Sequence, residues 1–411
     1  MRSEKNHCIS SNHHFKNKMD VRKVLVFIPS FGMGGTVSSL KSLLSLSDPK
    51  RILVDIFPLY SVGPNKNELP NSRILKESVW LSASIKDRGL GVKAIHYFLR
   101  LVKKLFRVVG IDLTPLYIRI GAKRMNTDSY DCVVSYSEDL TSLVSQIPAK
   151  KRIAWIHSIY SRYFRMIKER DESVFFEQYD HIVCVSEYAR KDFLSVYEQF
   201  TNKTLVIYNC CDEQRIQALS KEFYPKEFVK SAKSSCLFIV SVGRLDPVKQ
   251  FSKIPQIAYR IKQQLGDCFR WFIIGGPCGD GQEAHIISNE INKYNVSDVV
   301  LPIGAKSNPY PYIANADVLV HPSSSETYGI VIQEALALGI PAILNNYGSA
   351  QETVIDGING KIVPLEKIAE QVINAITDCE FLNSMRKNIQ EQNRQSSVLH
   401  LETSTLLFNL L

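Results

Sequence analysis

The stretch DVLVHPSSSETYGIVIQEALALGIPAILNN, residues 317–346, shows how this chain of 411 residues is organised. The apolar run ending in HPS predicts a buried strand, SETYG predicts a turn, and IVIQEALAL predicts a helix. Gly339 and Pro341 stop that helix, and the run PAILNN predicts the next strand. A strand, a helix and a second strand in this order are typical of a parallel sheet covered by helices on both faces.

The same alternation of strand and helix patterns runs along most of the chain. The predicted strands are apolar runs rich in β-branched residues, and they fall into two sets. The first set covers residues 23–30, 51–57, 131–137, 151–158, 181–187 and 204–209, and the second covers residues 236–243, 269–276, 299–304, 317–323 and 341–346. Two such sets predict an α/β protein with two doubly wound, Rossmann-like domains that face one cleft at the carboxyl ends of the strands.

The domain boundaries follow from where this alternation stops. The break falls between residues 209 and 235, where NCCDEQRI and a stretch rich in Lys and Ser interrupt the pattern. We therefore predict a disordered tail at residues 1–20, a first domain at 21–212, a second domain at 213–390 and a helical segment at 391–411.

The composition is that of a globular protein of the cytoplasm. The chain is 45% hydrophobic and 22% charged, with a formal net charge of +9. Its nine cysteines are scattered without CxxC or Cys/His spacing, which favours a reducing compartment over secretion. Residues 1–20 lack the apolar core of a signal peptide, and no apolar run reaches the ~20 residues of a transmembrane helix.

Two carboxylates, Glu326 and Glu334, stand in an almost wholly apolar part of the chain. Residues 307–360 contain no Lys or Arg, so neither glutamate has a basic partner nearby in sequence. Backbone N–H groups at the start of the predicted helix, from Gly329 to Val331, favour a phosphate, and carboxylates accept hydrogen bonds from sugar hydroxyls. A ligand that is part diphosphate and part polyol would explain both features. Solvated surface acids are the alternative, which fits poorly for Glu334 among its apolar neighbours.

Two further segments that follow predicted strands carry residues suited to phosphate. In GRLDPVKQF, residues 243–251, Arg244 and Lys249 stand five residues apart across a turn, a spacing that suits a clamp on a diphosphate. Solvated surface charges are the alternative. In SFGMGGTVSSL, residues 30–40, Gly34 and Gly35 let backbone N–H groups approach an anion. A tight turn without a ligand fits that loop as well, because the dinucleotide pattern GxGxxG fails at Val37.

Taken together, these motifs resemble those of a known enzyme family. The pattern E-x-[FY]-G followed by E-A-x-A-x-G-x-P stands here as ETYGIVIQEALALGIP, accompanied by GRLDPVK and IDGINGKIV. In these motifs the chain resembles the retaining glycosyltransferases of the GT-B fold, of the family 4 or group 1 type. The resemblance is close over residues 241–363, and in the first half it rests on FGMGG, WIHS and the VSE…R pattern at 185–190.

The resemblance implies a role for each matching residue. It implies that Arg244 and Lys249 neutralise the diphosphate leaving group, and that Glu326 holds the donor sugar. It also implies that His157, at the end of a predicted strand, approaches that sugar, although a structural histidine is the alternative there. The remaining predicted residues bind the donor or form the phosphate and acceptor loop: Glu334 for the ribose, then Gly329, Ile330, Val331, Tyr328 and Gly304, and finally Gly34 and Gly35.

The sequence also bears on the use of metal ions. No Asp-x-Asp occurs, which is the usual carboxylate pair for a divalent ion on a sugar nucleotide. We therefore predict no metal and no cofactor, with cationic side chains and helix dipoles stabilising the departing diphosphate. The resemblance likewise implies metal independence and retention of the anomeric configuration, and the lack of an obvious nucleophile favours front-face attack. One departure from the family is Gln250, which follows Lys249 where Gly is frequent.

The positive charge is concentrated in residues 81–125. Ten Lys or Arg and two Asp stand there, giving +8 against +9 for the whole chain. Apolar residues recur inside this segment at the three- and four-residue spacing of an amphipathic helix: Val92, Ile95, Leu99, Val102, Phe106 and Val109. Such a helix binds an anionic membrane surface, or it packs its apolar stripe in the core beneath a solvated basic face. No aromatic stacking platform accompanies the charge, so nucleic acid is not expected as a partner.

The sequence thus predicts a glycosyltransferase that moves a sugar from a nucleotide-diphosphate sugar, with UDP as the favoured nucleotide, to a hydroxyl acceptor. The basic segment favours a lipid-linked acceptor in the assembly of a bacterial surface polysaccharide (capsule, O-antigen or exopolysaccharide). The protein would then be peripheral on the inner face of the cytoplasmic membrane. Two alternatives stay open, a GT-B sugar-nucleotide epimerase and a non-catalytic sugar-nucleotide-binding module. A dehydrogenase is disfavoured by the failed glycine pattern.

Overall fold

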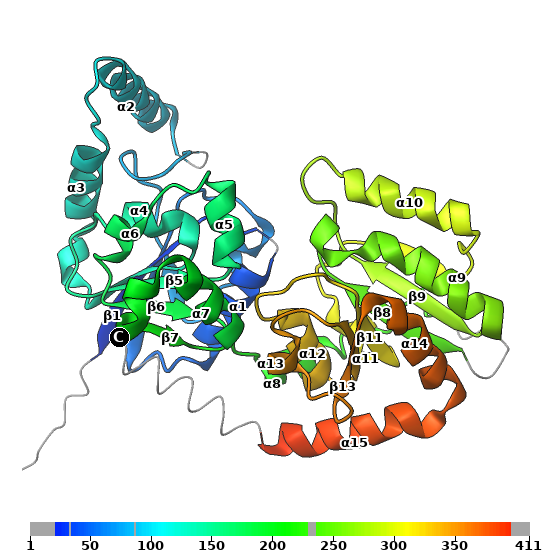
Figure 1. The fold of residues 1–411 in the computed structure, drawn as a ribbon. Coiled ribbons are helices and arrows are strands. Elements are labelled where there is room, and N and C mark those ends of the chain that lie inside the picture. The colour runs from blue at the N-terminus through cyan, green and yellow to red at the C-terminus, as the bar shows by residue number, and fades with distance from the viewer. Residues whose placement is uncertain (1–20, 33, 86–87, 229–235, 396–411) are drawn as a thin grey trace, which may run out of the picture.

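The computed structural model describes residues 21–32, 34–85, 88–228 and 236–395. The chain forms two α/β domains, each built on one parallel sheet with helices around it (Figure 1). The predicted tail at 1–20 lies outside the described residues, as does the predicted helical segment beyond residue 395. Within the described ranges, no helix is both long enough and apolar enough to cross a membrane.

The first domain contains a seven-stranded parallel sheet in the order β3-β2-β1-β4-β5-β6-β7. Its strands are β1 (Arg22–Ile28), β2 (Ile52–Pro58), β3 (Ser72–Ile74), β4 (Cys132–Ser135), β5 (Arg152–Ile156), β6 (His181–Cys184) and β7 (Thr204–Val206). The six predicted strands are confirmed. The edge strand β3 was missed because its three residues, SRI, carry no apolar run.

The second domain contains a six-stranded parallel sheet in the order β10-β9-β8-β11-β12-β13. Its strands are β8 (Leu237–Val242), β9 (Phe269–Ile274), β10 (Val300–Gly304), β11 (Val318–His321), β12 (Ala342–Asn345) and β13 (Gly360–Val363). The five predicted strands are confirmed, and β13 is the edge strand that the sequence patterns did not reveal. Both sheets reverse their strand order at a central strand, β1 or β8, which makes them doubly wound and Rossmann-like.

Helices cover both faces of each sheet (Figure 1). In the first domain they are α1 (Gly35–Leu46), α2 (Leu90–Val108), α3 (Thr114–Met125), α4 (Thr141–Val144), α5 (Tyr160–Met166), α6 (Ser173–Phe176) and α7 (Glu187–Val196). From the connection onward they are α8 (Glu213–Leu219), α9 (Ile254–Leu265), α10 (Gln282–Tyr294), α11 (Tyr310–Ala314), α12 (Ile330–Ala337), α13 (Ala350–Thr353), α14 (Ile368–Thr377) and α15 (Cys379–Gln395).

The continuous apolar runs of the strands have a direct structural reason. In β1, Val24 and Val26 face one buried cluster, while Leu25 and Phe27 face another on the opposite side of the sheet. Because successive side chains of a strand point to opposite faces, a strand buried on both faces must be apolar at every position. The second domain repeats this arrangement with two clusters of its own.

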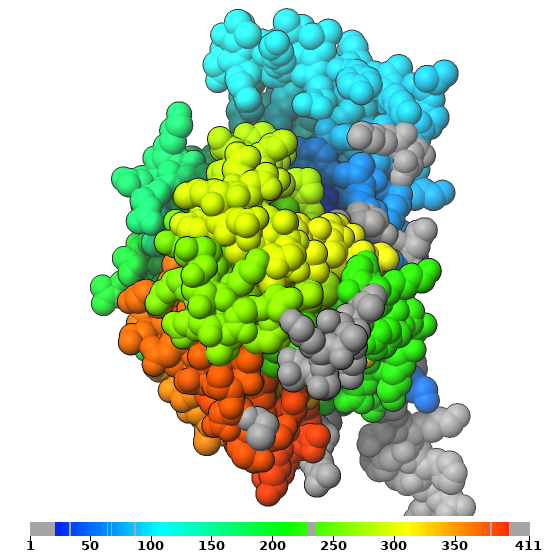
Figure 2. All heavy atoms as spheres, turned by 90° about the vertical axis from the view of Figure 1, so that its right-hand side faces the viewer, coloured from blue at the N-terminus to red at the C-terminus, as the bar shows by residue number. Residues whose placement is uncertain are grey.

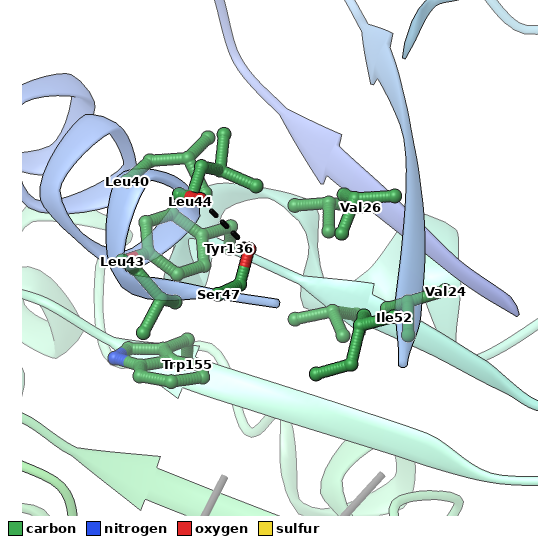
Figure 3. A pocket seen from close by; sticks show the side chains of 11 residues that line it. Val24, Val26, Leu40, Leu43, Leu44, Ser47, Ile52, Tyr136 and Trp155 are labelled. Carbon is green, nitrogen blue, oxygen red and sulfur yellow. Dashed lines mark hydrogen bonds between the residues drawn. The ribbon is translucent and has the colours of Figure 1, made fainter. Parts of the chain in front are cut away.

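A small apolar cavity lies between α1 and the first sheet (Figure 3). Its volume is about 40 Å³, and it is lined mainly by aliphatic and aromatic side chains from α1 and strands β1, β2, β4 and β5. Two of the lining residues carry hydroxyls: that of Ser47 donates to the carbonyl oxygen of Leu44 at 2.7 Å, and that of Tyr136 lies 2.8 Å from the hydroxyl of Ser39. Because the cavity is small and its lining is apolar, it has the features of a packing defect rather than of a ligand site.

The two domains touch where the carboxyl ends of their strands meet. The Ser186 hydroxyl donates to the carbonyl oxygen of Thr327 at 2.6 Å. The carboxylate of Glu352 accepts hydrogen bonds from the backbone N–H groups of Glu187 and Tyr188, at 2.7 and 2.8 Å. The start of α7 in the first domain therefore holds both the 325–329 turn and α13 of the second domain.

Candidate functional site

A cleft of about 930 Å³ lies between the domains. It brings together eleven of the predicted site residues: Gly34, Gly35, His157, Arg244, Lys249, Glu326, Tyr328, Gly329, Ile330, Val331 and Glu334. Gly304 is not among the lining residues, which continue from its neighbour Ala305 to Tyr310. Residues from both halves of the chain thus share one site, as expected where the carboxyl ends of two doubly wound sheets face each other.

Glu326 is a buried, ionised carboxylate at the centre of this cleft. Its side chain is 12% exposed and is paired with Lys249. Burial alone would raise the pKa of Glu326, but the neighbouring His321 and Lys249 outweigh it and lower the pKa to about 2. The alternative of a solvated loop acid is therefore wrong for Glu326.

His321 is a site residue that the sequence analysis missed. It ends β11, is fully buried, and its Nε2 atom lies 2.6 Å from the Glu326 carboxylate. Because an ionised carboxylate only accepts, His321 must donate this hydrogen bond from Nε2. Its position five residues before Glu326, at the carboxyl end of a predicted strand, was the available signal.

The loop that contains Arg244 is in close contact with the loop after β9. The N–H of Gly243 donates to the carbonyl oxygen of Ile274 at 3.0 Å. A Cβ added at Gly275 would lie 1.9 Å from the carbonyl oxygen of Gly243, so only glycine fits there. Gln250 has φ of +53°, the left-handed conformation that glycine adopts most easily, so the turn after Lys249 forms without the glycine frequent in the family.

Arg244 itself is exposed to the cleft. Its guanidinium lies 4.0 Å from the Cys278 sulfur, and among the described residues no carboxylate lies within ion-pair distance of it. An unpaired guanidinium keeps its five donors available, and their planar arrangement suits phosphate oxygens.

The N-terminus of α12 opens onto the same cleft. Gly329 precedes the helix with φ of +78°, and a Cβ there would lie 2.7 Å from Ile332. No side chain in the described part of the chain caps this helix, and its first turn carries no acid. Its first N–H groups therefore remain available to a phosphate, which the helix dipole also favours.

Glu334 lies one turn further along α12 and is only 8% exposed. Its carboxylate accepts from the Tyr310 hydroxyl at 3.0 Å and from Ser38 of the first domain at 3.4 Å. Burial raises the pKa of Glu334 to about 7, and these hydrogen bonds together with the charge of Arg215 oppose the shift only in part. The alternative of a solvated acid on the helix surface is wrong for this residue.

Arg215 was also missed by the sequence analysis. It lies in α8, the helix that follows the last strand of the first domain, and it lines the cleft. Its charge acts on both Glu334 and Tyr310. Nothing in the motif containing Glu334 points to Arg215, because 119 residues separate the two in sequence.

Tyr328, a predicted donor-binding residue, contacts both the cleft and the core of the first domain. It borders the cleft, but it is 8% exposed and belongs to the core cluster of the first domain, together with Val37 and Ile207. Its ring lies 5.5 Å from that of Tyr208, centroid to centroid. Tyr328 therefore anchors the turn of the second domain in the first domain.

His157 follows β5 and forms part of the first domain's wall of the cleft. Its ring packs on Tyr136, with 4.7 Å between ring centroids, and its backbone N–H donates to Glu138 at 3.2 Å. Burial lowers the pKa of His157 to about 3, so the imidazole is neutral at physiological pH. Its Nε2 atom is buried without a hydrogen-bond partner in the described structure.

The glycine loop of the first domain abuts the start of α12. A Cβ at Gly35 would lie 3.3 Å from the Cδ1 atom of Ile330. Beside this loop, Lys41 of α1 donates to the side chain of Asn65 at 2.7 Å and is paired with Glu68. The side chains of Lys41, Asn65 and Glu68 all line the cleft and add polar groups to the wall that the first domain forms.

The described residues contain no group of three or more His, Cys, Asp or Glu side chains arranged to hold a metal ion. The cationic side chains that line the cleft are those of Lys41, Arg215, Arg244, Lys249 and Lys306.

Comparison with known proteins shows what the second domain is similar to. The model of the family described as "Glycosyl transferases group 1" matches residues 224–396, which include Arg244, Lys249, Glu326 and Glu334. The chain is 31% identical over 166 residues to the D-inositol 3-phosphate glycosyltransferase of Kribbella flavida, covering 38% of this chain and 39% of that protein. It is 29% identical over 160 residues to the lipopolysaccharide core biosynthesis glycosyltransferase LpsE of Rhizobium meliloti, covering 39% and 44%. The chain thus matches less than half the length of these two relatives.

The fold likeness extends over nearly the whole chain. The structure of Alr3699/HepE from Anabaena, in complex with UDP and glucose, superposes with a TM-score of 0.67. The superposition covers 94% of this chain and 98% of that one at 17% identity, which shows a shared GT-B fold of two Rossmann-like domains. The chain therefore has the GT-B fold, and its second domain is similar to the glycosyl transferases group 1.

Proposed function

We propose that this protein is a retaining glycosyltransferase that moves a sugar from a nucleotide-diphosphate sugar to a hydroxyl acceptor, without metal or cofactor. The observation that carries the proposal is the arrangement around the start of α12. Arg244, Lys249 and an uncapped helix N-terminus line the same cleft as an ionised carboxylate, Glu326, and a buried one, Glu334. A diphosphate flanked by a hexose on one side and a ribose on the other has the matching chemistry.

The diphosphate would be the leaving group. Arg244 presents a guanidinium that has no carboxylate partner among the described residues, Lys249 presents an ammonium that is also paired with Glu326, and α12 presents its first N–H groups. These groups are in position before the reaction, so they stabilise the charge that develops as the bond from the anomeric carbon to the phosphate oxygen breaks. This electrostatic stabilisation supports a reaction that needs no divalent ion.

Glu326 suits the donor sugar rather than proton transfer. With its pKa lowered to about 2, its carboxylate stays ionised and accepts hydrogen bonds from sugar hydroxyls. We propose front-face attack: the acceptor hydroxyl oxygen bonds to the anomeric carbon on the face that the diphosphate leaves. The hydroxyl proton passes to the departing phosphate oxygen, so retention needs no covalent intermediate.

The nucleoside would lie along α11 and α12. Glu334 would accept from the ribose hydroxyls, and the residues from Ala305 to Tyr310 would border the base. We propose UDP as the nucleotide. The UDP bound in the structure of Alr3699/HepE supports this choice by analogy of fold.

We propose further that the acceptor is lipid-linked and that the reaction belongs to the assembly of a bacterial surface polysaccharide, at the inner face of the cytoplasmic membrane. The similarity to LpsE, a lipopolysaccharide core biosynthesis enzyme, supports this placement, as does the charge of +8 in residues 81–125. The polar wall formed by Lys41, Asn65 and Glu68 is the part of the cleft available to the acceptor's sugar hydroxyls.

The proposal can be tested with purified protein, EDTA and a panel of UDP- and GDP-sugars, with and without a lipid-linked saccharide acceptor. We expect release of UDP from one donor and a product with retained anomeric configuration, by NMR. Activity should be lost in Glu326→Ala and Lys249→Ala and kept in Lys253→Ala, a matched exposed lysine outside the cleft.

Other outcomes overturn the proposal. Conversion of the sugar without nucleotide release means an epimerase. Binding of a donor without turnover, even with lipid-linked acceptors, means a non-catalytic binding module. Activity that EDTA abolishes and a divalent ion restores rules out the metal-free reaction.

A further inference from the structure

Helix α2 presents an apolar face to solvent. It stands at the outer end of the first domain, far from the second domain (Figure 1), and its segment forms the cyan top of the molecule in Figure 2. Of its side chains only His96 is buried. The most exposed apolar side chains form what we term the α2 apolar face: Leu90 (86%), Val108 (80%), Tyr97 (66%), Phe98 (63%), Leu105 (59%) and Leu101 (54%).

The spacing of these residues places them on one side of the helix. From Leu90 to Val108 they are separated by seven, one, three, four and three residues, which keeps them within a single stripe. The opposite side is held to the domain by polar contacts. The Nδ1 atom of His96 lies 3.1 Å from the carbonyl oxygen of Val79, and Arg100 donates to the carbonyl oxygen of Ala83 at 3.0 Å.

The helix therefore differs from an ordinary surface helix, because it presents a row of large apolar side chains to solvent. The alternative that the predicted stripe packs in the core holds only in part. Val92, Leu99 and Val102 of that stripe are half-buried, whereas Ile95, Phe106 and Val109 are 54%, 42% and 70% exposed. Exposed apolar faces of this size mark interaction surfaces in folded proteins.

The positive charge beside the α2 apolar face indicates what kind of partner this face binds. Basic side chains flank the α2 apolar face, with Lys93, Lys104 and Arg107 on one border, whereas Lys103 is half-buried and burial lowers its pKa. A second copy of this chain would bring equal positive charges together. A surface with an apolar interior and anionic groups at its boundary complements both features, and that is the interface of an anionic lipid bilayer.

We propose that the α2 apolar face inserts into the interfacial layer of an anionic lipid bilayer, with Lys93, Lys104 and Arg107 against the lipid headgroups. A helix of nineteen residues lying flat covers about 28 Å of membrane surface. This proposal goes beyond the notion of a charged patch resting on a membrane, because it requires apolar insertion. It also does not depend on the transfer reaction.

The test is sedimentation of the full chain with vesicles of phosphatidylcholine alone or mixed with phosphatidylglycerol. We expect binding to the mixed vesicles, part of it retained at high salt. The double variant Leu101→Gln/Leu105→Gln should lower the partition coefficient at least about tenfold, because two leucines no longer insert. The double variant Lys104→Glu/Arg107→Glu should also lower it.

A matched control removes exposed apolar side chains elsewhere. Met166→Gln/Val174→Gln changes residues that are 69% and 55% exposed in α5 and α6, and it should bind vesicles as the parent does. UDP release from the donor without vesicles should be equal in all these variants, which separates this proposal from the proposed activity.

Three results would overturn the inference. The first is no binding to mixed vesicles. The second is binding that Leu101→Gln/Leu105→Gln leaves unchanged, which means a purely electrostatic contact. The third is a dimer in solution that this variant dissociates, which means that a second copy covers the face.

Discussion

The Nε2 atom of His321 lies 2.6 Å from Oε1 of Glu326, and Lys249 is paired with the same oxygen. The three residues come from the end of β11, the turn after it and the turn after β8. Glu326 thus owes its low pKa to two neighbours, one from its own loop and one from a loop 77 residues away. This pairing connects Glu326, the proposed donor-sugar residue, to Lys249, a proposed phosphate residue.

His321 is a positioning residue for Glu326, and His321→Phe tests this role. The variant keeps an aromatic side chain but removes the donor, so the pKa of Glu326 should rise because only Lys249 then opposes burial. We expect turnover at pH 7.5 to fall by about 10- to 100-fold, the equivalent of one hydrogen bond to a charged group. The acid limb of the pH–rate profile should move to higher pH.

His321→Gln is the matched control, because its amide keeps a donor. His321→Gln should recover part of the turnover, and the acid limb of its pH–rate profile should lie close to that of the parent. A His321→Phe profile with lower turnover but the same acid limb would mean that His321 acts only through packing.

Glu334 should make the stability of the free protein depend on pH. Its pKa is raised from 4.5 to about 7 in the folded state, so the unfolded chain loses this proton first as pH rises. The stabilisation is complete below about pH 4.5 and is lost as pH rises through 7. Glu334→Gln removes this loss and should raise the free energy of unfolding at pH 8, relative to the parent, by on the order of 3 kcal/mol.

Chemical denaturation of both proteins at pH 5 and pH 8 measures the difference. The gain from Glu334→Gln should be larger at pH 8 than at pH 5. An equal effect at the two pH values would show that Glu334 is already ionised in the folded protein. UDP affinity of the variant should fall, because a neutral amide accepts less strongly from ribose hydroxyls.

Arg244 should bind the diphosphate of the nucleotide rather than its nucleoside. Its guanidinium faces the cleft without a carboxylate partner among the described residues, so Arg244→Ala leaves no buried charge uncompensated. We expect the affinity for UDP to fall by about 10- to 100-fold, as for the loss of a charge-assisted hydrogen bond, with a smaller change for UMP.

Calorimetric titration with UDP, UMP and uridine measures this discrimination. Arg260→Ala is the control, since Arg260 donates to the carbonyl oxygen of Glu366 and does not line the cleft. An equal loss of affinity for all three ligands would show that Arg244 supports the fold of the cleft instead of binding phosphate.

Glu352 should hold the two domains together. Its carboxylate accepts from the first N–H groups of α7, so Glu352→Ala removes a cap that crosses the domain interface. We expect a loss of about 1 kcal/mol in stability, typical of a lost N-terminal cap, and a larger radius of gyration in small-angle scattering.

Glu370→Ala, which removes an exposed acid paired with Lys367 on the second domain, is the control and should change neither quantity. If Glu352→Ala leaves the radius of gyration unchanged, the contact through Ser186 and the anchored Tyr328 suffices to keep the domains closed.

Much of the fold follows from the sequence alone. The apolar runs, the helix stops and the turn motif at 325–329 are local signals, because strand and helix periods extend over a few residues only. They predicted eleven of the thirteen strands and both sheets. The strands β3 and β13 were not predicted because they are short edge strands. An edge strand pairs with only one neighbouring strand, so fewer of its residues need to be apolar.

The tertiary structure decided what the local signals could not. It placed His321 against Glu326, and Arg215 and Ser38 near Glu334, because these residues meet only when loops distant in sequence converge at the carboxyl ends of the strands. It placed the ring of Tyr328 in the core of the other domain. It also showed that the α2 apolar face, made of residues other than the predicted stripe, is exposed to solvent, because periodicity does not show which side of a helix packs against the domain.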